Sequence, residues 1–273
     1  MNTVRGPEQL FDSEDRWVTS MGTWFPGERV VLRGQDLFHD LKELSWMALL
    51  LYAITGRILD ERQVWLFEGI WRISSSYPEP RLWNNRIAAL AVSVRSTGSL
   101  GVSAGIAVSE ATIYGQRPLI RAMEFLLRAQ EQLNQGINLT DVVLAELKKH
   151  RGIAGFGRPI IRTDERIAPL MALVEELGYG DGVYVNLVFE VEKILLAGGW
   201  RLHMNIAALD AALAADQGLT VGQFYMYMIL CFTAGIVPCA IDASRSPAGT
   251  FFPLRCNRIQ YEGRPHRLWE RHS

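Results

Sequence analysis

Apolar residues recur every three or four positions along most of this chain, which is the spacing of one face of an α-helix. Residues 61–74 show the pattern, with Trp65 and Ile70 on one stripe. Residues 29–32, apolar between two glycines, predict the one strand, in a short hairpin arm. The sequence therefore predicts an all-α fold. The expected helices cover residues 36–44, 45–56, 61–74, 84–95, 100–111, 118–135, 141–149, 164–177, 183–196, 206–215 and 221–236.

One apolar stretch approaches the length that crosses a bilayer. Residues 217–241 contain no charged side chain. Gly235 and Pro238 interrupt the stretch, and no Lys or Arg flanks its start, so the pattern favours a buried helix over a membrane span. Residues 1–20 are polar and acidic and show no signal peptide. We expect a cytoplasmic protein without a membrane partner.

Composition and charge narrow the function classes. The chain has 273 residues, of which 49% are hydrophobic, enough for a large core. Lys and Arg number 28 against 29 Asp and Glu, whereas nucleic-acid-binding domains usually carry a basic excess, so no nucleic-acid partner is expected. Cys231, Cys239 and Cys256 form no CxxC pair and no zinc spacing, so we expect reduced thiols and no metal site.

The most informative segment is residues 155–166, which read GFGRPIIRTDER. It resembles the Gly-Phe-Gly-His-Arg…Asp-Pro-Arg segment of the citrate synthase and citryl-CoA lyase superfamily. Three further blocks resemble that superfamily in the same order. They are residues 29–34 (RVVLRG), residues 96–106 (STGSLGVSAGI) and a C-terminal set made of Asn205-Ile206, residues 233–235 (TAG) and residues 258–263 (RIQYEG). The resemblance covers almost the whole chain.

The resemblance implies a citrate synthase-like all-α fold, with a smaller helical domain inserted in a larger one. On that basis residues 1–113 and 212–273 would form the large domain and residues 114–211 the small domain. The family works as a homodimer with its active site in the interdomain cleft. It condenses an acyl-CoA with a keto acid or cleaves the product, so CoA or an acyl-CoA is a candidate substrate, a small carboxylate a candidate ligand, and no tightly bound cofactor is expected.

The positions that match the family's acid–base residues carry other side chains here. No histidine of this chain falls on a catalytic position, and ordinary citrate synthesis by the family mechanism is therefore not expected. Two family arginines are retained, at Arg166 and Arg258. The replacements are Tyr114 and Arg158 for two histidines, the His-free residues 82–85 for a third, Ala207 for the catalytic aspartate, and Phe232 and Cys256 for two arginines.

Two interpretations remain open. In the first, the cleft performs C–C bond formation or cleavage with new catalytic residues. Arg158 would hold a carboxylate or stabilise an oxyanion, Tyr114 would donate a hydrogen bond, and Asp210, one turn after Ala207, would supply a displaced carboxylate. In the second, the protein is an inactive homologue that acts as a ligand-binding, regulatory or partner subunit.

Further residues are assigned by the resemblance or by position. His203, close before Asn205, is a weaker candidate for the cleft. Asp210 is as compatible with a surface position as with a catalytic one. Tyr114 is as compatible with a core position as with a hydrogen-bond donor in the cleft. The expected substrate-binding residues are Asn85, Gln116, Arg166, Asn205 and Arg258, and the expected CoA-binding residues are Gly155 and Gly157.

Overall fold

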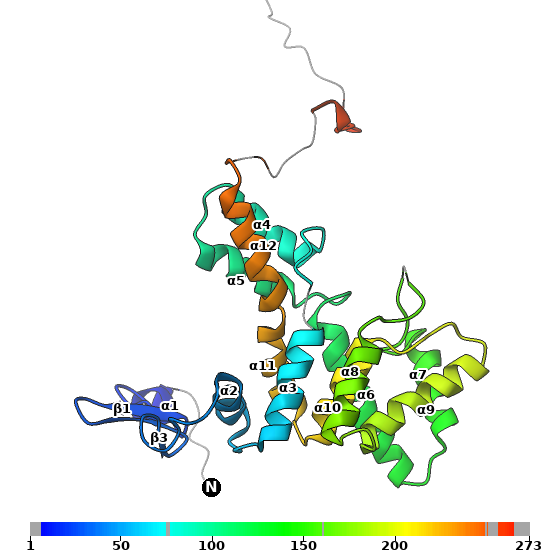
Figure 1. Cartoon of the computed structure of the whole chain (residues 1–273), viewed down its shortest axis with the longest axis horizontal. Helices are drawn as coiled ribbons and strands as arrows, with labels where there is room; N and C mark the ends of the chain where they lie inside the picture. The colour runs from blue at the N-terminus through cyan, green and yellow to red at the C-terminus, as the bar shows by residue number, and fades with distance from the viewer. Residues whose placement is uncertain (1–6, 75–76, 160, 249, 251–255, 265–273) are drawn as a thin grey trace, which may run out of the picture. The chain divides into compact units, whose positions relative to one another are not determined.

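The computed structural model describes residues 7–74, 77–159, 161–248, 250 and 256–264, and the described part is mainly helical (Figure 1). The predicted all-α fold class is confirmed. The helices are α1 (Pro7–Asp12), α2 (Trp46–Thr55), α3 (Glu61–Ser74), α4 (Trp83–Ser93), α5 (Gly98–Val108), α6 (Gln116–Asn134), α7 (Leu139–His150), α8 (Ile167–Leu177), α9 (Val183–Ala197), α10 (Ile206–Asp216), α11 (Val221–Cys231), α12 (Thr233–Arg245) and the 3₁₀ turn η1 (Cys256–Arg258).

A small antiparallel sheet forms the N-terminal arm. Its strands β1 (Gly22–Phe25), β2 (Arg29–Leu32) and β3 (Gln35–Asp36) lie in the order β1-β2-β3, and β2 coincides with the predicted strand. The arm is tied to α2 by two side chains. Arg33 donates to the carbonyl of Ala53 at 2.9 Å, and the Tyr52 hydroxyl donates to the carbonyl of Arg33 at 3.1 Å.

The predicted helix over residues 36–44 is wrong, and turns replace it. The Asp36 carboxylate accepts hydrogen bonds from the backbone of Phe38 (2.8 Å) and His39 (3.0 Å). The Asp40 carboxylate in turn accepts from the backbone of Asp36 at 2.8 Å. Short acidic side chains that satisfy nearby backbone N–H groups stabilise turns in place of helix, and here they outweigh the helical apolar spacing.

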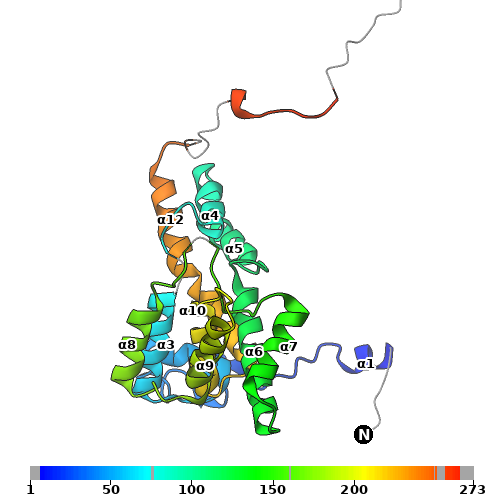
Figure 2. The ribbon, with the colours of Figure 1, turned by 90° about the vertical axis from the view of Figure 1, so that its right-hand side faces the viewer.

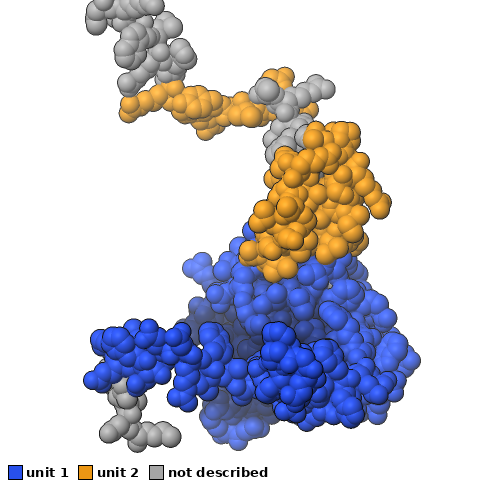
Figure 3. All heavy atoms as spheres, turned by 90° about the vertical axis from the view of Figure 1, so that its left-hand side faces the viewer, with its two compact units in different colours: residues 1–77, 108–234 blue, residues 78–107, 235–273 orange. Residues whose placement is uncertain are grey.

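The described chain divides into two compact units (Figure 3). Unit 1 comprises residues 1–77 and 108–234, and unit 2 comprises residues 78–107 and 235–273. These bounds differ from those predicted for the family's domains, because α8 and α10 pack against α3 within unit 1. The division at residues 114 and 211 therefore stays a prediction.

The core of unit 1 is built around α10. Ten of its eleven residues, Ile206–Ala215, are buried. Six alanines among them keep the helix narrow, and α10 packs against α6 and α9 (Figure 2). A helix that is apolar all round belongs in a core. Because α10 is held on several sides, its N-terminus is a rigid platform for the loop described below.

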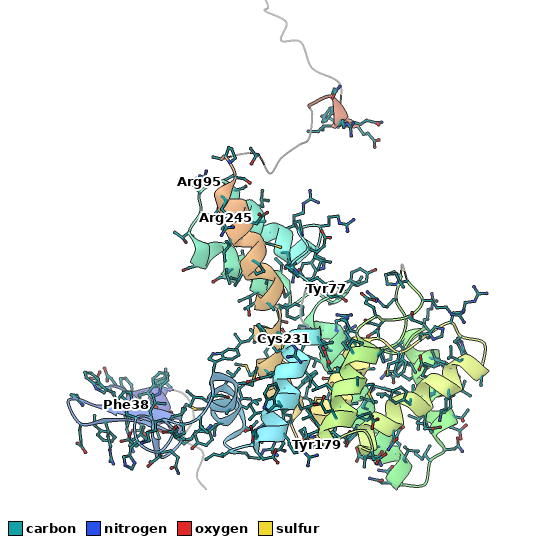
Figure 4. All side chains as sticks on the ribbon, viewed as in Figure 1. Phe38, Tyr77, Arg95, Tyr179, Cys231 and Arg245 are labelled. Carbon is teal, nitrogen blue, oxygen red and sulfur yellow. The ribbon has the colours of Figure 1, made fainter. Side chains whose placement is uncertain are left out.

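Unit 2 is built from α4, α5 and most of α12. A small core of Ala89, Cys239 and Ala243 joins α4 to α12. Arg95, labelled in Figure 4, donates hydrogen bonds to the carbonyls of Ser244 (3.0 Å) and Ser246 (3.1 Å) and so ties the end of α4 to the end of α12.

The apolar stretch predicted as a buried helix forms α11 and the start of α12. By length and composition alone, the segment Val221–Arg245 is apolar enough to cross a membrane, and 44% of its most apolar window is buried. Within unit 1, α11 packs against α2, α3 and α6 and buries Phe224, Tyr227 and Cys231. This packing accounts for the apolar character of α11. The helix predicted over residues 221–236 is divided at Phe232, and its second part, α12, extends to Arg245.

Candidate active site

Two backbone segments of unit 1 meet at the start of α10. Phe156 and Met204 pair as an isolated antiparallel bridge, and both side chains are buried. The N–H of Gly157 donates to the carbonyl of His203 at 2.6 Å, and the N–H of Asn205 donates to the carbonyl of Gly155 at 2.9 Å. Residues 155–157, here named the glycine loop, are thus fixed against the residues that lead into α10.

The glycine loop needs glycine at its first position. Gly155 has a φ of +87°, in the left-handed region that L side chains rarely adopt. A Cβ at this position would lie 2.6 Å from the Ala208 Cβ and 2.9 Å from the Ala208 Cα. Because Ala208 is a fully buried part of α10, it cannot move aside cheaply.

We expect Gly155→Ala to destabilise the protein more than Gly136→Ala. Both positions have a left-handed φ, +87° and +83°, so both variants carry the backbone cost of about 1–2 kcal/mol. A Cβ at Gly136 meets nothing within 4 Å, whereas at Gly155 it collides with α10. The overpacking at Gly155 should add about 1–3 kcal/mol to the loss of unfolding free energy, measured by urea denaturation. Equal losses in the two variants would contradict the close approach.

Polar side chains satisfy the N-terminus of α10. Asn205 is the N-cap, and its Oδ1 accepts from the N–H of Ala207 at 3.0 Å while its Nδ2 donates to the carbonyl of Gly157 at 2.8 Å. The Asp164 carboxylate accepts from the N–H of Ile206 at 3.0 Å. A carboxylate at a helix N-terminus interacts favourably with the helix dipole. Asn205 therefore joins the helix to the glycine loop, and Asp164 joins it to the following loop.

Asp164 and Arg166 form a bidentate ion pair. Arg166 donates from Nε to Oδ1 at 2.8 Å and from Nη2 to Oδ2 at 2.7 Å, while its Nη1 donates to the carbonyl of Ser74 at 3.3 Å. Its guanidinium also lies over the ring of Tyr77, 5.6 Å from the centroid. The Asp164 side chain is fully buried. Burial alone would raise its pKa, but the Arg166 guanidinium and the hydrogen bond from Ile206 hold that pKa below the usual range.

Arg158 pairs with the neighbouring carboxylate. Its Nη1 forms an ion pair with Glu165 and lies 3.5 Å from Asp164 Oδ1. Tyr77, labelled in Figure 4, donates its hydroxyl proton to Glu165 at 2.7 Å. The hydrogen bonds from Tyr77 and Arg158 lower the pKa of Glu165 to about 2, and burial together with the Glu165 bond raises the pKa of Tyr77 to about 12. This pair is more open than the Asp164–Arg166 pair, because the Glu165 side chain is 52% exposed.

Asp210 is fully buried on α10 and is linked to the Asp164–Arg166 pair through Ser74. Its Oδ1 accepts from the Ser74 hydroxyl at 2.7 Å, and its Oδ2 has no hydrogen-bond partner among the residues that the structure describes. Burial raises the pKa of Asp210 to about 7, against the opposing effects of the Ser74 hydrogen bond and the Arg166 charge. A carboxyl group with a pKa near 7 has the acid strength that general acid–base chemistry uses at neutral pH.

The structure brings six of the predicted site residues together in unit 1. They are Gly155, Gly157, Arg158, Arg166, Asn205 and Asp210, and the hydrogen bonds and ion pairs above connect them through Asp164 and Ser74. Sequence reasoning did not identify Ser74, Tyr77, Asp164 or Glu165 as site residues. The sequence did carry a signal for Asp164 and Glu165. The run of residues 163–166 contains no apolar residue and places two carboxylates beside Arg166.

Four predicted residues lie elsewhere. Tyr114 is 62% exposed on the loop before α6, with a left-handed φ of +61°. Gln116 is buried, and its amide donates to the carbonyl of Tyr225 at 2.7 Å, so this side chain holds α6 to α11. Asn85 is buried in unit 2 and donates to the carbonyl of Glu79 at 3.1 Å. Arg258 is exposed in η1 of unit 2. Their substrate roles stay predictions.

Among the described residues, no group of three or more His, Cys, Asp or Glu side chains could hold a metal ion. The arrangement in unit 1 is instead a set of two arginines and three carboxyl groups. Such a set can exchange one of its own carboxylates for that of a ligand, since arginine recognises carboxylates through a planar pair of donors.

Comparison with known proteins identifies the fold. No family model and no curated protein sequence matches the chain. Among solved structures, citryl-CoA lyase from Hydrogenobacter thermophilus is similar with a TM-score of 0.81 and 21% identity, over 93% of this chain and 97% of that one. ATP citrate lyase from Methanothrix soehngenii, in complex with citrate and coenzyme A, has a TM-score of 0.70 and 16% identity, over 97% of this chain and 45% of that one. Citrate synthase from Thermotoga maritima has a TM-score of 0.63 and 15% identity, over 84% and 60%. The predicted citrate synthase-like fold is confirmed.

Proposed function

We propose that this protein is a divergent citrate synthase-like enzyme that forms or breaks a C–C bond of a carboxylate-bearing CoA thioester. The observation that carries the proposal is the fold likeness to citryl-CoA lyase, which extends over 93% of this chain and 97% of that protein. The cluster around Arg158 supports it, because a cluster of charged groups beside a glycine loop is the kind of site that binds a small anionic substrate.

Arg158 is the residue that we assign to the substrate carboxylate. Its ion pair with Glu165 is partly open to solvent, so a ligand carboxylate can take the place of Glu165 on the same guanidinium. Arginine stays protonated and cannot act as a base, so its role is to bind the carboxylate or to stabilise an oxyanion. Arg166 is engaged by Asp164, Ser74 and Tyr77, and we assign it to holding the loop in place.

The remaining roles follow from the same proposal. The glycine loop would shape the CoA subsite, because its backbone groups at Gly155 and Gly157 are bonded to residues 203–205. Asp210 would serve as an acid–base group only if the site opens above it, since it has no exposed surface here. We further propose that the enzyme acts in the cytoplasm as a homodimer, with Tyr114 and Gln116 as additional substrate-side residues.

The proposal is tested by calorimetric titration of citrate, coenzyme A and acetyl-CoA into the purified full chain. We expect binding of citrate in the wild type, and a loss of about ten-fold or more in affinity in Arg158→Gln, because hydrogen bonds to charged groups contribute about 1.5–3 kcal/mol. The matched control is Arg128→Gln, which breaks an Arg–Glu pair of 3.2 Å between α6 and α7 outside the site. Failure of all three ligands to bind would rule the proposal out.

A ligand-binding or regulatory subunit without catalysis is the second candidate. One observation favours it: both arginines already have carboxylate partners within the chain, so the charge of the cluster is satisfied without a substrate. This candidate predicts that citrate or coenzyme A binds while citryl-CoA is not cleaved. A subunit that completes an active paralogue would also co-purify with that paralogue.

A further inference from the structure

His203, beside the glycine loop, contacts a carboxylate through one ring nitrogen and an arginine through the other. His203 Nδ1 lies 3.3 Å from Glu192 Oε1, and His203 Nε2 lies 2.8 Å from Arg162 Nε. The histidine and the glutamate are mostly buried, with 15% and 22% of their side chains exposed, whereas Arg162 is exposed. None of these three residues takes part in the Arg158 or Arg166 ion pairs described above.

The contacts fix the tautomer of the ring. Arginine stays protonated, so Arg162 Nε–H is the donor and His203 Nε2 must be the acceptor. The ring proton then sits on Nδ1 and points to the Glu192 carboxylate. Glu192 is itself oriented, because the same Oε1 accepts from the N–H of Met204 at 2.8 Å. The result is an imidazole ring that donates from Nδ1 to Glu192 and accepts at Nε2 from the exposed Arg162.

The position of His203 connects it to the candidate site. Its carbonyl accepts from the N–H of Gly157, and Asn205, the N-cap of α10, follows two residues later. Arg162 belongs to the loop that also carries Arg158 and Asp164. His203 therefore lies on the segment that anchors the glycine loop, and Glu192 contacts it from α9. Arg162 is an exposed side chain that can leave Nε2 when a ligand arrives.

We propose that His203 is the acid–base group of this site, that Glu192 is its positioning residue, and that Arg162 covers Nε2 until substrate binds. This inference rests on the proposed function and names a residue that the family's pattern does not supply. A carboxylate that holds one ring nitrogen and leaves the other to react is a recurring arrangement for histidine bases.

The step balances without a further reactant. In cleavage of a β-hydroxyacyl thioester, His203 Nε2 takes the hydroxyl proton and the oxygen pair forms a new C=O bond. The C–C bond breaks, and its electron pair passes to the α-carbon of the thioester as an enolate. The enolate then takes up one proton, which the imidazolium returns. A released Arg162 or Arg158 can stabilise the enolate oxygen, because guanidinium donors favour developing negative charge.

The test compares variants of the full chain with citryl-CoA, coenzyme A and acetyl-CoA as probes. We expect His203→Gln to lower the rate of citryl-CoA cleavage about 100-fold or more, within the range of general acid–base catalysis, with KM changed only a few-fold. Glu192→Gln should lower kcat with KM little changed, because a neutral amide orients the ring less well, and Glu192→Asp should restore part of the rate because it keeps a carboxylate for the Nδ1 proton. The matched control is His150→Gln, which removes a surface histidine 3.9 Å from Glu146 on α7.

A second measurement does not depend on turnover. Diethyl pyrocarbonate should modify His203 faster in Arg162→Ala than in the wild type, and saturating coenzyme A or acetyl-CoA should protect it. If these ligands bind in the calorimeter but neither protects His203, or if His203→Gln cleaves citryl-CoA at the wild-type rate, the inference is wrong and the proposed function stands. If none of citrate, coenzyme A and acetyl-CoA binds, the proposed function and this inference fail together.

Discussion

Replacing Asp164 by Asn is expected to lower the free energy of unfolding by about 3–5 kcal/mol, the cost of breaking a buried ion pair by removing one partner. Asp164 accepts two hydrogen bonds from the Arg166 side chain, one from the Arg166 backbone and one from the N–H of Ile206. Asparagine keeps one acceptor oxygen, but its NH₂ group would face an N–H donor of Arg166 or Ile206. Arg166 would then be a largely buried charge without its carboxylate.

The control for this prediction is the next residue in the chain. Glu165→Gln removes a carboxylate of similar chemistry that is 52% exposed, and exposed ion pairs contribute only about 0–1 kcal/mol. Equilibrium urea unfolding of the two variants at pH 7 gives the comparison. A loss in Asp164→Asn no larger than that in Glu165→Gln would show that the Asp164–Arg166 pair does not hold the loop.

The effect of Asp164 should also depend on pH in a defined direction. The pKa of Asp164 is lower in the folded protein than its ordinary value. A group of this kind stabilises the fold above the pKa that it has in the unfolded chain, and the stabilisation is lost as the pH falls through the folded-state pKa. The difference in stability between the wild type and Asp164→Asn should therefore shrink as the solution is acidified.

The sequence identified the segment of the site but not the partners of its charges. Residues 155–166 indicated the fold, and the helical spacing predicted β2 and most helices. The spacing failed over residues 36–44, where hydrogen bonds from Asp36 and Asp40 decide the local structure. The partner of Asp210 is Ser74, which lies 136 positions away in the chain. Pairing over such distances follows from how α3 and α10 pack, and periodicity carries no information on it.

Residue type alone also does not show whether a polar side chain faces the site, the solvent or the protein interior. Gln116 is polar and occupies a position near a family histidine, but its amide is used within the protein, by the carbonyl of Tyr225. Asp210 was equally compatible with the surface and with a site, and it is fully buried. A buried carboxyl group is costly unless it is neutral or paired, so its presence in the core of unit 1 changes how the protein should respond to pH.

Replacing Asp210 by Asn is expected to make the protein more stable than the wild type at neutral and alkaline pH. Burial raises the pKa of Asp210 in the folded state to about 7, about three units above that of an ordinary aspartate. The folded protein thus binds this proton more tightly than the unfolded chain does. Its contribution to stability is complete below the unfolded pKa and is lost as the pH rises through about 7. At about 1.4 kcal/mol per pKa unit, the loss amounts to about 4 kcal/mol.

Asparagine has nearly the shape of a protonated aspartate and never ionises, so Asp210→Asn should escape this loss. We expect the difference in unfolding free energy between the variant and the wild type to grow by about 4 kcal/mol from pH 4 to pH 8 in urea titrations. Ser74→Ala is the control, because it removes the hydrogen bond to Asp210 Oδ1 but leaves the carboxyl group. The stability of the Ser74→Ala variant should therefore still fall with rising pH. Parallel pH profiles for Asp210→Asn and the wild type would mean that Asp210 is solvated in the native protein. In that case the Asp210 side chain is reached by solvent in the native protein, and a substrate could reach it as well.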